Sequence, residues 1–227
     1  MRKTEEKTML KQAKVNPDAV EDLLGEWHPL VAQLGSADGM HALSTASSSL
    51  KQRRIASLEA LKNFLLAYQM QILIPLELPA IQRGFLHASR NETRELIALD
   101  KEVSQEPLLR NFASASERVG QYHLKRLRPL RDVRLVQRYI RAVEAGNAHG
   151  WHTLVYGMTL SVYSLPLRQG LASYERQTLR GFMNAAVQSL RLSEKDCDLI
   201  IEELCGEVPQ AVDSEVRQEF DLKLARE

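Results

Sequence analysis

The chain has 227 residues, of which 44% are hydrophobic, 26% are charged and 6% are aromatic, and its formal net charge is +1. This length is enough for one domain with a sizeable core, while the near-neutral charge by itself favours neither nucleic acids nor membranes as partners. The 2 cysteines, Cys197 and Cys205, exclude a disulfide scaffold, and no alternating run of β-branched and aromatic residues is long enough to predict a sheet.

The N-terminal part is mostly polar. The opening MRKTEEKTML has no continuous apolar segment, so we expect no secretory signal and a cytoplasmic location. No apolar run approaches the roughly 20 residues that span a bilayer, so we expect no membrane contact. Residues 1–15 are expected to form a flexible tail and residues 16–227 a single domain. Asn16 and Pro17 suit the start of a helix, and residues 35–51, rich in Gly, Ser and Thr, are the best loop candidate.

The next region is apolar and helical. One helix is predicted from Ile55 to Pro75, where the proline should end it, and a second over residues 76–89. Residues 91–103 form a third helix with one apolar face, made by Leu96, Leu99 and Val103. Glu95 and Asp100 on this helix are interpreted as ordinary surface charges.

Further helices follow in the C-terminal half. Residues 171–190 predict a long helix, and SEKD at 193–196 predicts a capping box that starts another. Three apolar faces are expected: Val133, Val136, Ile140 and Val143; Trp151, Leu154, Val155, Met158 and Val162; and Cys197, Ile200, Ile201 and Leu204. The sequence therefore predicts an all-α, bundle-like domain of about eight to ten helices.

Charge is distributed unevenly along the chain. Residues 118–141 contain eight Lys or Arg and one acid, whereas residues 192–227 contain eleven acids and four bases. The two stretches are interpreted first as solvated helix faces of opposite sign, and alternatively as docking surfaces or as surfaces that complement each other within the protein. Because the basic stretch contains only the isolated Tyr122 and Tyr139 for base stacking, we expect no nucleic-acid partner, although salt-sensitive RNA or DNA binding stays open as a third reading.

Two histidines are the strongest candidates for chemistry. His149 and His152, three apart on a predicted helix, could chelate a metal ion, but packing, capping or interface roles are favoured because nearby acidic ligands are lacking. The chain has no P-loop, HExxH or GxSxG motif and no paired carboxylates suited to acid–base work. We therefore assign no catalytic, cofactor-binding or metal-binding residue and expect no enzymatic activity.

Several stretches taken together resemble one known family. SRNETRELIALDKEV (89–103) resembles the ETREL helix of urease accessory protein F, the UreF family. Residues 152–204 are similar to its C-terminal half, with His152 five residues before Gly157, a turn at Leu165-Pro166, then Tyr174 and Ala185-Ala186-Val187. SLEALKNFL and LELPAI fall where the family has its second helix and a following ELP, so the likeness covers roughly residues 30–225.

The resemblance implies a non-enzymatic adaptor. Members of the family are all-α homodimers that bind the accessory protein UreD (UreH) and the GTPase UreG and help to insert nickel into apo-urease. No cofactor is implied, and nickel would be handled only transiently in the complex. The six candidates for partner contact are His149, Trp151, His152 and Tyr156, with Arg94 and Glu95 on the ETREL helix.

The chain departs from the family pattern at its N-terminal signature. Where the family has DSALPxGxFxHSxGLE, this sequence has SADGMHALSTASSSLK and keeps only Ser47 and Leu50. Two alternatives therefore stay open: an adaptor of the same fold that serves another partner, and a small helical metal-dependent enzyme that uses His149 and His152.

Overall fold

The computed structural model describes residues 43, 46–52 and 54–205, and this part of the chain is helical without a strand. The elements are α4 (Leu58–Tyr68), η1 (Gln69–Glu77), α5 (Leu78–Ser89), α6 (Thr93–Gln105), η2 (Arg110–Phe112), α7 (Ala113–Leu127), α8 (Arg134–Glu144), α9 (His152–Val162), α10 (Leu167–Leu190) and α11 (Glu194–Cys205). The predicted all-α fold is confirmed. The expected tail at 1–15 and the predicted helix start at Asn16 lie outside the described residues.

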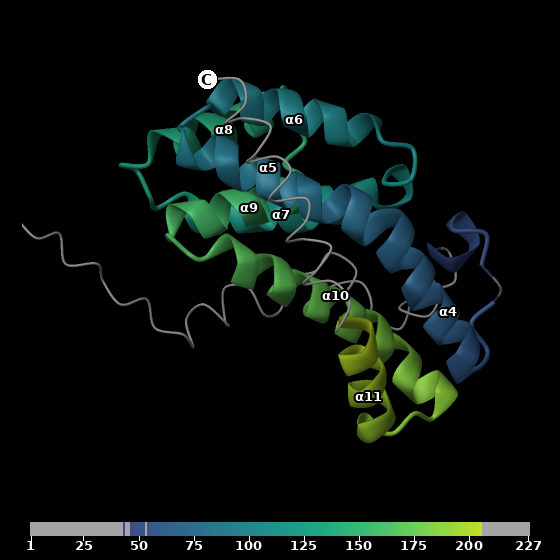
Figure 1. The fold of residues 1–227 in the computed structure, drawn as a ribbon. Coiled ribbons are helices and arrows are strands. Elements are labelled where there is room, and N and C mark those ends of the chain that lie inside the picture. The colour runs from purple at the N-terminus through teal and green to yellow at the C-terminus, as the bar shows by residue number, and fades with distance from the viewer. Residues whose placement is uncertain (1–42, 44–45, 53, 206–227) are drawn as a thin grey trace, which may run out of the picture.

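The helices α4, η1 and α5 form one continuous, bent path through the molecule (Figure 1). The helix begins at Leu58, because the Ser57 hydroxyl accepts a hydrogen bond from the Ala60 N–H at 3.2 Å. The prediction that Pro75 ends it is wrong, since Pro75 lies inside η1, which is a π-helix. The wider π-helical turns accommodate the missing N–H and the bulk of the proline ring, so the helix bends and continues.

This long helical path also corrects the expectation about apolar runs. Leu58–Ser89, with 32 residues, is long and apolar enough to cross a membrane by length and composition alone. Its most apolar window is 56% buried inside the protein, however, as in the core helix of a folded domain. Two of its polar residues, Gln69 and Glu77, are themselves buried and hydrogen-bonded to other core side chains, which suits a core helix.

Most of the predicted helix faces are confirmed. Leu96, Leu99 and Val103 of α6 are buried, as are Cys197, Ile200, Ile201 and Leu204 of α11. On α8, Val136 and Ile140 are buried and Val143 is half-buried, while Val133 immediately precedes the helix. The capping box also forms, because the Ser193 hydroxyl accepts from the Asp196 N–H at 3.2 Å and the Asp196 carboxylate accepts from the Ser193 N–H at 3.4 Å.

The predicted loop at 35–51 is wrong for the part that the structure describes. Residues 46–49 are helical. The two residues that match the UreF signature, Ser47 and Leu50, are buried, with exposed fractions of 1% and 3%. What this chain keeps of the signature therefore lies in the core.

Helix α9 lies at the centre of the fold and is buried on all sides. Every residue from His152 to Leu160 is buried, so α9 has no polar outer face. It crosses α5 closely, and a Cβ atom at Gly157 would lie 2.2 Å from the carbonyl oxygen of Ile81. Glycine is required at 157 because any side chain would push the two helices apart.

Helix α11 is attached to the core through a buried amide. The Gln69 side-chain nitrogen donates to the Glu175 carboxylate at 3.0 Å and to the Leu204 carbonyl at 3.1 Å. Burial raises the pKa of Glu175 to about 7. At the surface, Lys62 and Glu203 form an ion pair at 2.7 Å that also joins α4 to α11.

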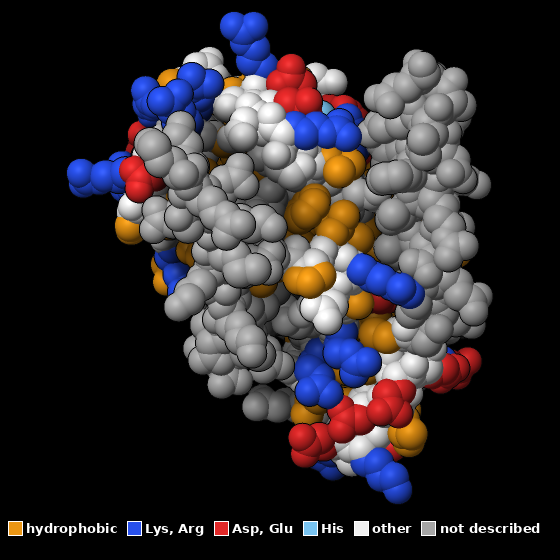
Figure 2. All heavy atoms as spheres, turned by 60° about the vertical axis from the view of Figure 1, so that its left-hand side comes forward, with side chains coloured by type: hydrophobic (Ala, Val, Ile, Leu, Met, Phe, Trp, Pro, Cys, Tyr) orange, Lys and Arg blue, Asp and Glu red, His pale blue; other side chains and the backbone are white. Residues whose placement is uncertain are grey.

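Charged side chains of both signs are spread over the molecule. Figure 1 places α6 and α8 at one end and α11 at the other. On the face shown in Figure 2, hydrophobic side chains form a central strip and Lys and Arg side chains gather at the upper left. Asp and Glu side chains form a row at the lower end, with Lys and Arg side chains next to them, and further Asp and Glu side chains lie near the top.

Candidate functional site

One buried carboxylate organises the segment between α8 and α9. Asp100 of α6 is completely buried, and its carboxylate accepts hydrogen bonds from the backbone N–H groups of His149 (2.6 Å), Gly150 (3.0 Å) and Trp151 (3.3 Å). The Tyr139 hydroxyl donates a fourth bond at 2.5 Å. The interpretation of Asp100 as an ordinary surface charge is therefore wrong, whereas Glu95 is exposed as expected.

The same segment is pressed against α7. The Ser116 hydroxyl accepts from the His152 N–H at 3.2 Å, and a Cβ atom at Gly120 would lie 1.9 Å from the Gly150 carbonyl oxygen. Gly150 itself has a φ of +77°, a conformation that glycine adopts without strain. These contacts hold the segment before α9 in one position.

Three of the six candidates for partner contact lie in the core. Trp151, His152 and Tyr156 have exposed fractions of 2%, 0% and 1%. The Trp151 indole donates to the Ser104 hydroxyl at 2.6 Å, and the Tyr156 hydroxyl donates to the Gly170 carbonyl at 2.9 Å. In this structure these side chains stabilise the fold and are not accessible to a partner.

His152 belongs to a buried aromatic cluster. Its ring centroid lies 5.3 Å from that of His123, 6.0 Å from that of Tyr156 and 5.8 Å from that of Tyr174. Burial lowers the pKa of His123 to about 4, so that ring is neutral at pH 7. The cluster is therefore a packing element built largely from aromatic faces and edges.

Of the two candidate histidines, His149 is the one that reaches the surface. It lies in the segment before α9, so the prediction that His149 and His152 share one helix face is wrong. Its Nδ1 lies 3.1 Å from a Glu117 carboxylate oxygen, and the Gln121 side chain donates to its carbonyl at 3.2 Å. Among the described residues, no group of three or more His, Cys, Asp or Glu side chains could hold a metal ion.

Arg94 and Glu95 are also accessible. Both are exposed in the first turn of α6. The structure therefore leaves three of the six candidates, Arg94, Glu95 and His149, on the surface, and no hydrogen bond or ion pair within the described chain joins the first two to the third.

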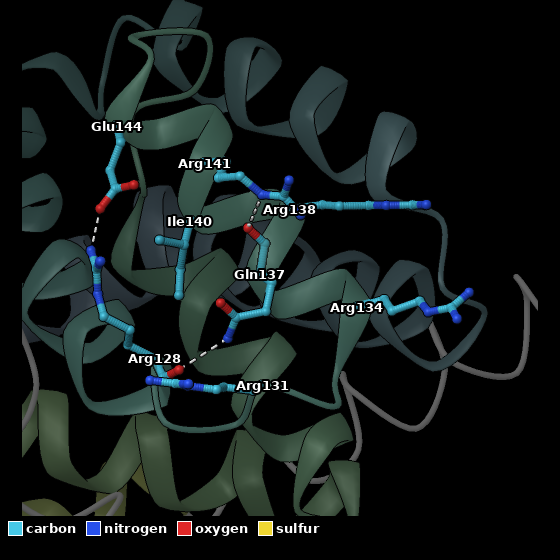
Figure 3. Close-up of a pocket in the computed structure, with 8 residues that line it drawn as sticks. All are labelled: Arg128, Arg131, Arg134, Gln137, Arg138, Ile140, Arg141 and Glu144. Atoms are coloured by element: carbon cyan, nitrogen blue, oxygen red, sulfur yellow. Dashed lines mark hydrogen bonds and ion pairs between the residues drawn. The ribbon is translucent and has the colours of Figure 1, made fainter.

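A strongly basic hollow of the described surface lies along α8 and the turn before it. This α8 basic groove has a volume of about 690 Å³. Its eight lining residues are Arg128, Arg131, Arg134, Gln137, Arg138, Ile140, Arg141 and Glu144 (Figure 3). The sequence signal for this groove is the basic stretch 118–141, which composition alone indicates only as a solvated helix face or a docking surface.

Hydrogen bonds from side chains to backbone carbonyls hold the turn of the groove against α8. The Gln137 side chain donates to the carbonyls of Arg128 (3.0 Å) and Leu130 (3.1 Å), which ties the turn to α8. The Arg141 guanidinium donates to the Gln137 carbonyl at 3.2 Å. Arg128 forms an ion pair with Glu144, the one acid of the groove. The arginines thus project from a backbone that is held in place.

Comparison with known proteins identifies one related family. A family model described as UreF matches residues 55–205, a range that spans α4 through α11. A comparison with curated proteins found no match.

Proposed function

The chain belongs to the UreF family of urease accessory proteins, and we propose that it acts as a non-enzymatic adaptor in the insertion of nickel into apo-urease. In this proposal it binds a UreD/UreH-type protein and a UreG-type GTPase, and nickel is the cargo of the complex. We further propose that it works in the cytoplasm as a homodimer.

The observation that carries the proposal is the extent of the family match. It covers 55–205, and so includes every helix from α4 to α11, the α8 basic groove and the segment that Asp100 holds. The α8 basic groove supports a role in docking, because complementary charge steers partners together and fixes their orientation.

A second candidate function is that of a UreF-fold adaptor for a different system. One observation favours it: the two retained residues of the N-terminal signature, Ser47 and Leu50, are both buried. A chain that kept only the core residues of this segment would keep the fold while changing what its surface recognises.

Co-purification distinguishes the two candidates. The tagged chain is expressed with the UreD-type and UreG-type proteins of its own source, together and singly, and the eluate is separated by size. We expect a stable complex that contains all three proteins. If the chain elutes alone while circular dichroism shows it to be helical, the assignment to urease maturation is wrong and the second candidate is favoured.

A further inference from the structure

The α8 basic groove carries positive charge that the described part of the chain leaves largely unneutralised. Five of its eight lining residues are arginines, and one, Glu144, is acidic. Glu144 is engaged by Arg128. Within residues 43, 46–52 and 54–205, Arg131, Arg134 and Arg138 form no ion pair.

These arginines oppose the stability of the helix that carries them. Arg134 is the first residue of α8, where the helix dipole already places positive charge, and Arg131 lies in the turn just before it. Arg134 and Arg138 are one turn apart, so their like charges repel. The buried face of α8, which includes Val136 and Ile140, would pack equally well with neutral or acidic residues at the exposed positions. Stability of the free chain therefore gives no reason for this charge.

We propose that the α8 basic groove is a docking site for an acidic segment of a partner protein. The inference rests on the proposed function, because the partner is sought among the proteins with which this chain assembles. Guanidinium groups bind carboxylates with two parallel hydrogen bonds, and an acidic segment would relieve the repulsion between the arginines. Ion pairs between arginine and carboxylate groups give an interface both attraction and a defined orientation.

The arrangement of the side chains favours a protein segment over other anions. In Figure 3, Arg134 and Arg138 extend away from α8 to one side, whereas Arg128 points toward Glu144, so the guanidinium groups do not converge on one small ligand. None of the eight lining residues is aromatic, although single-stranded nucleic acids are bound largely by stacking on aromatic rings. A row of separated cations on a fixed backbone suits a row of carboxylates.

Charge reversal tests the groove with a matched control. Arg134→Glu/Arg138→Glu reverses two exposed arginines of the groove. Lys101→Glu/Lys195→Glu makes the same change in net charge at two exposed lysines outside it. Each variant is titrated with the UreD-type and the UreG-type protein separately, over a series of salt concentrations.

We expect Arg134→Glu/Arg138→Glu to weaken binding of one of the two partners by about tenfold or more, with a shallower salt dependence than the wild type. The control variant should bind both partners like the wild type. Arg134→Gln/Arg138→Gln should give an intermediate loss. The groove variant should keep its helical circular dichroism, because an acid at the start of α8 favours the helix.

The results also separate this inference from the proposed function. If the wild type binds its partners and the groove variant binds them equally well, the inference is wrong and the proposed function stands. If the wild type binds neither partner, both are wrong. The wild type is also tested for binding of a short single-stranded RNA and for self-association. If the groove variant loses either of these while its partner binding is unchanged, the groove binds RNA or a second copy of the chain, and the inference is overturned.

Discussion

Replacing Asp100 tests whether its carboxylate holds the segment before α9. One carboxylate oxygen accepts from the His149 N–H, and the other accepts from the Gly150 and Trp151 N–H groups and the Tyr139 hydroxyl. In Asp100→Asn, the side-chain amide can keep only one acceptor oxygen. The less costly orientation keeps three of these bonds and leaves the His149 N–H facing another donor.

The expected loss follows from these contacts. A fully buried donor without an acceptor costs about 1–3 kcal/mol of the free energy of unfolding, and the His149 N–H is only partly buried, so Asp100→Asn should lose about 1 kcal/mol. Asp100→Ala removes all the acceptors and leaves several donors without a partner, so it should lose more than Asp100→Asn, about 3 kcal/mol or more. Glu95→Gln, an exposed change on the same helix, should stay within about 0.5 kcal/mol of the wild type.

Urea denaturation followed by circular dichroism measures these differences. Amide hydrogen exchange at His149, Gly150 and Trp151 supplies a local readout, because all three N–H groups should exchange faster once the carboxylate is gone. If Asp100→Ala unfolds at the same urea concentration as Glu95→Gln, the carboxylate does not hold this segment and the reasoning is refuted.

Three further predictions concern the core. Gly157→Ala should lower stability by about 1–3 kcal/mol or more in thermal unfolding, because its Cβ would lie 2.2 Å from the Ile81 carbonyl; an unchanged melting temperature would show that α5 and α9 can separate at no cost. Burial raises the pKa of Glu175 to about 7, above its ordinary 4.5, so the wild type loses free energy of unfolding as the pH rises from 4.5 to 7 and Glu175 must ionise in the core. In urea denaturation, the free energy of unfolding of Glu175→Gln should exceed that of the wild type by up to about 3 kcal/mol at pH 8, and the difference should be small below pH 4.5. Burial lowers the pKa of His123 to about 4, below its ordinary 6.5, so the wild type loses free energy of unfolding as the pH falls from 6.5 to 4. The free energy of unfolding of His123→Gln should fall less over this pH range than that of the wild type. An unchanged pH profile would mean that His123 is not buried in its neutral form.

Local signals in the sequence predicted local structure well. The SEKD capping box at 193–196 was predicted from its spacing and forms as expected, because its two partners lie within one helical turn. The face of α6 was likewise predicted from a repeat of apolar residues. Pro75 gave the wrong boundary, since a proline predicts the end of an α-helix but carries no information about a change to π-helical turns.

The candidate site depended on contacts between distant residues. Asp100 looked like a surface charge because the groups that bury it lie 39 to 51 residues further along the chain. His152 is a candidate ligand or contact residue in the sequence, but it is buried with the rest of α9; the absence of Asp, Glu, Lys and Arg from this helix is the sequence signal that indicates burial on every side. The basic stretch 118–141 was recognised, yet only the fold shows that the turn after α7 and the outer face of α8 combine into one groove.

The most direct test of the account is the nickel content of urease made with and without this chain. Apo-urease is assembled with its remaining accessory proteins in the presence of nickel, and the metal bound to purified urease is measured. The account predicts that urease holds its nickel only when this chain is present, and that added Lys101→Glu/Lys195→Glu restores loading better than added Arg134→Glu/Arg138→Glu. Full nickel loading in the absence of the chain would contradict its proposed role in urease maturation.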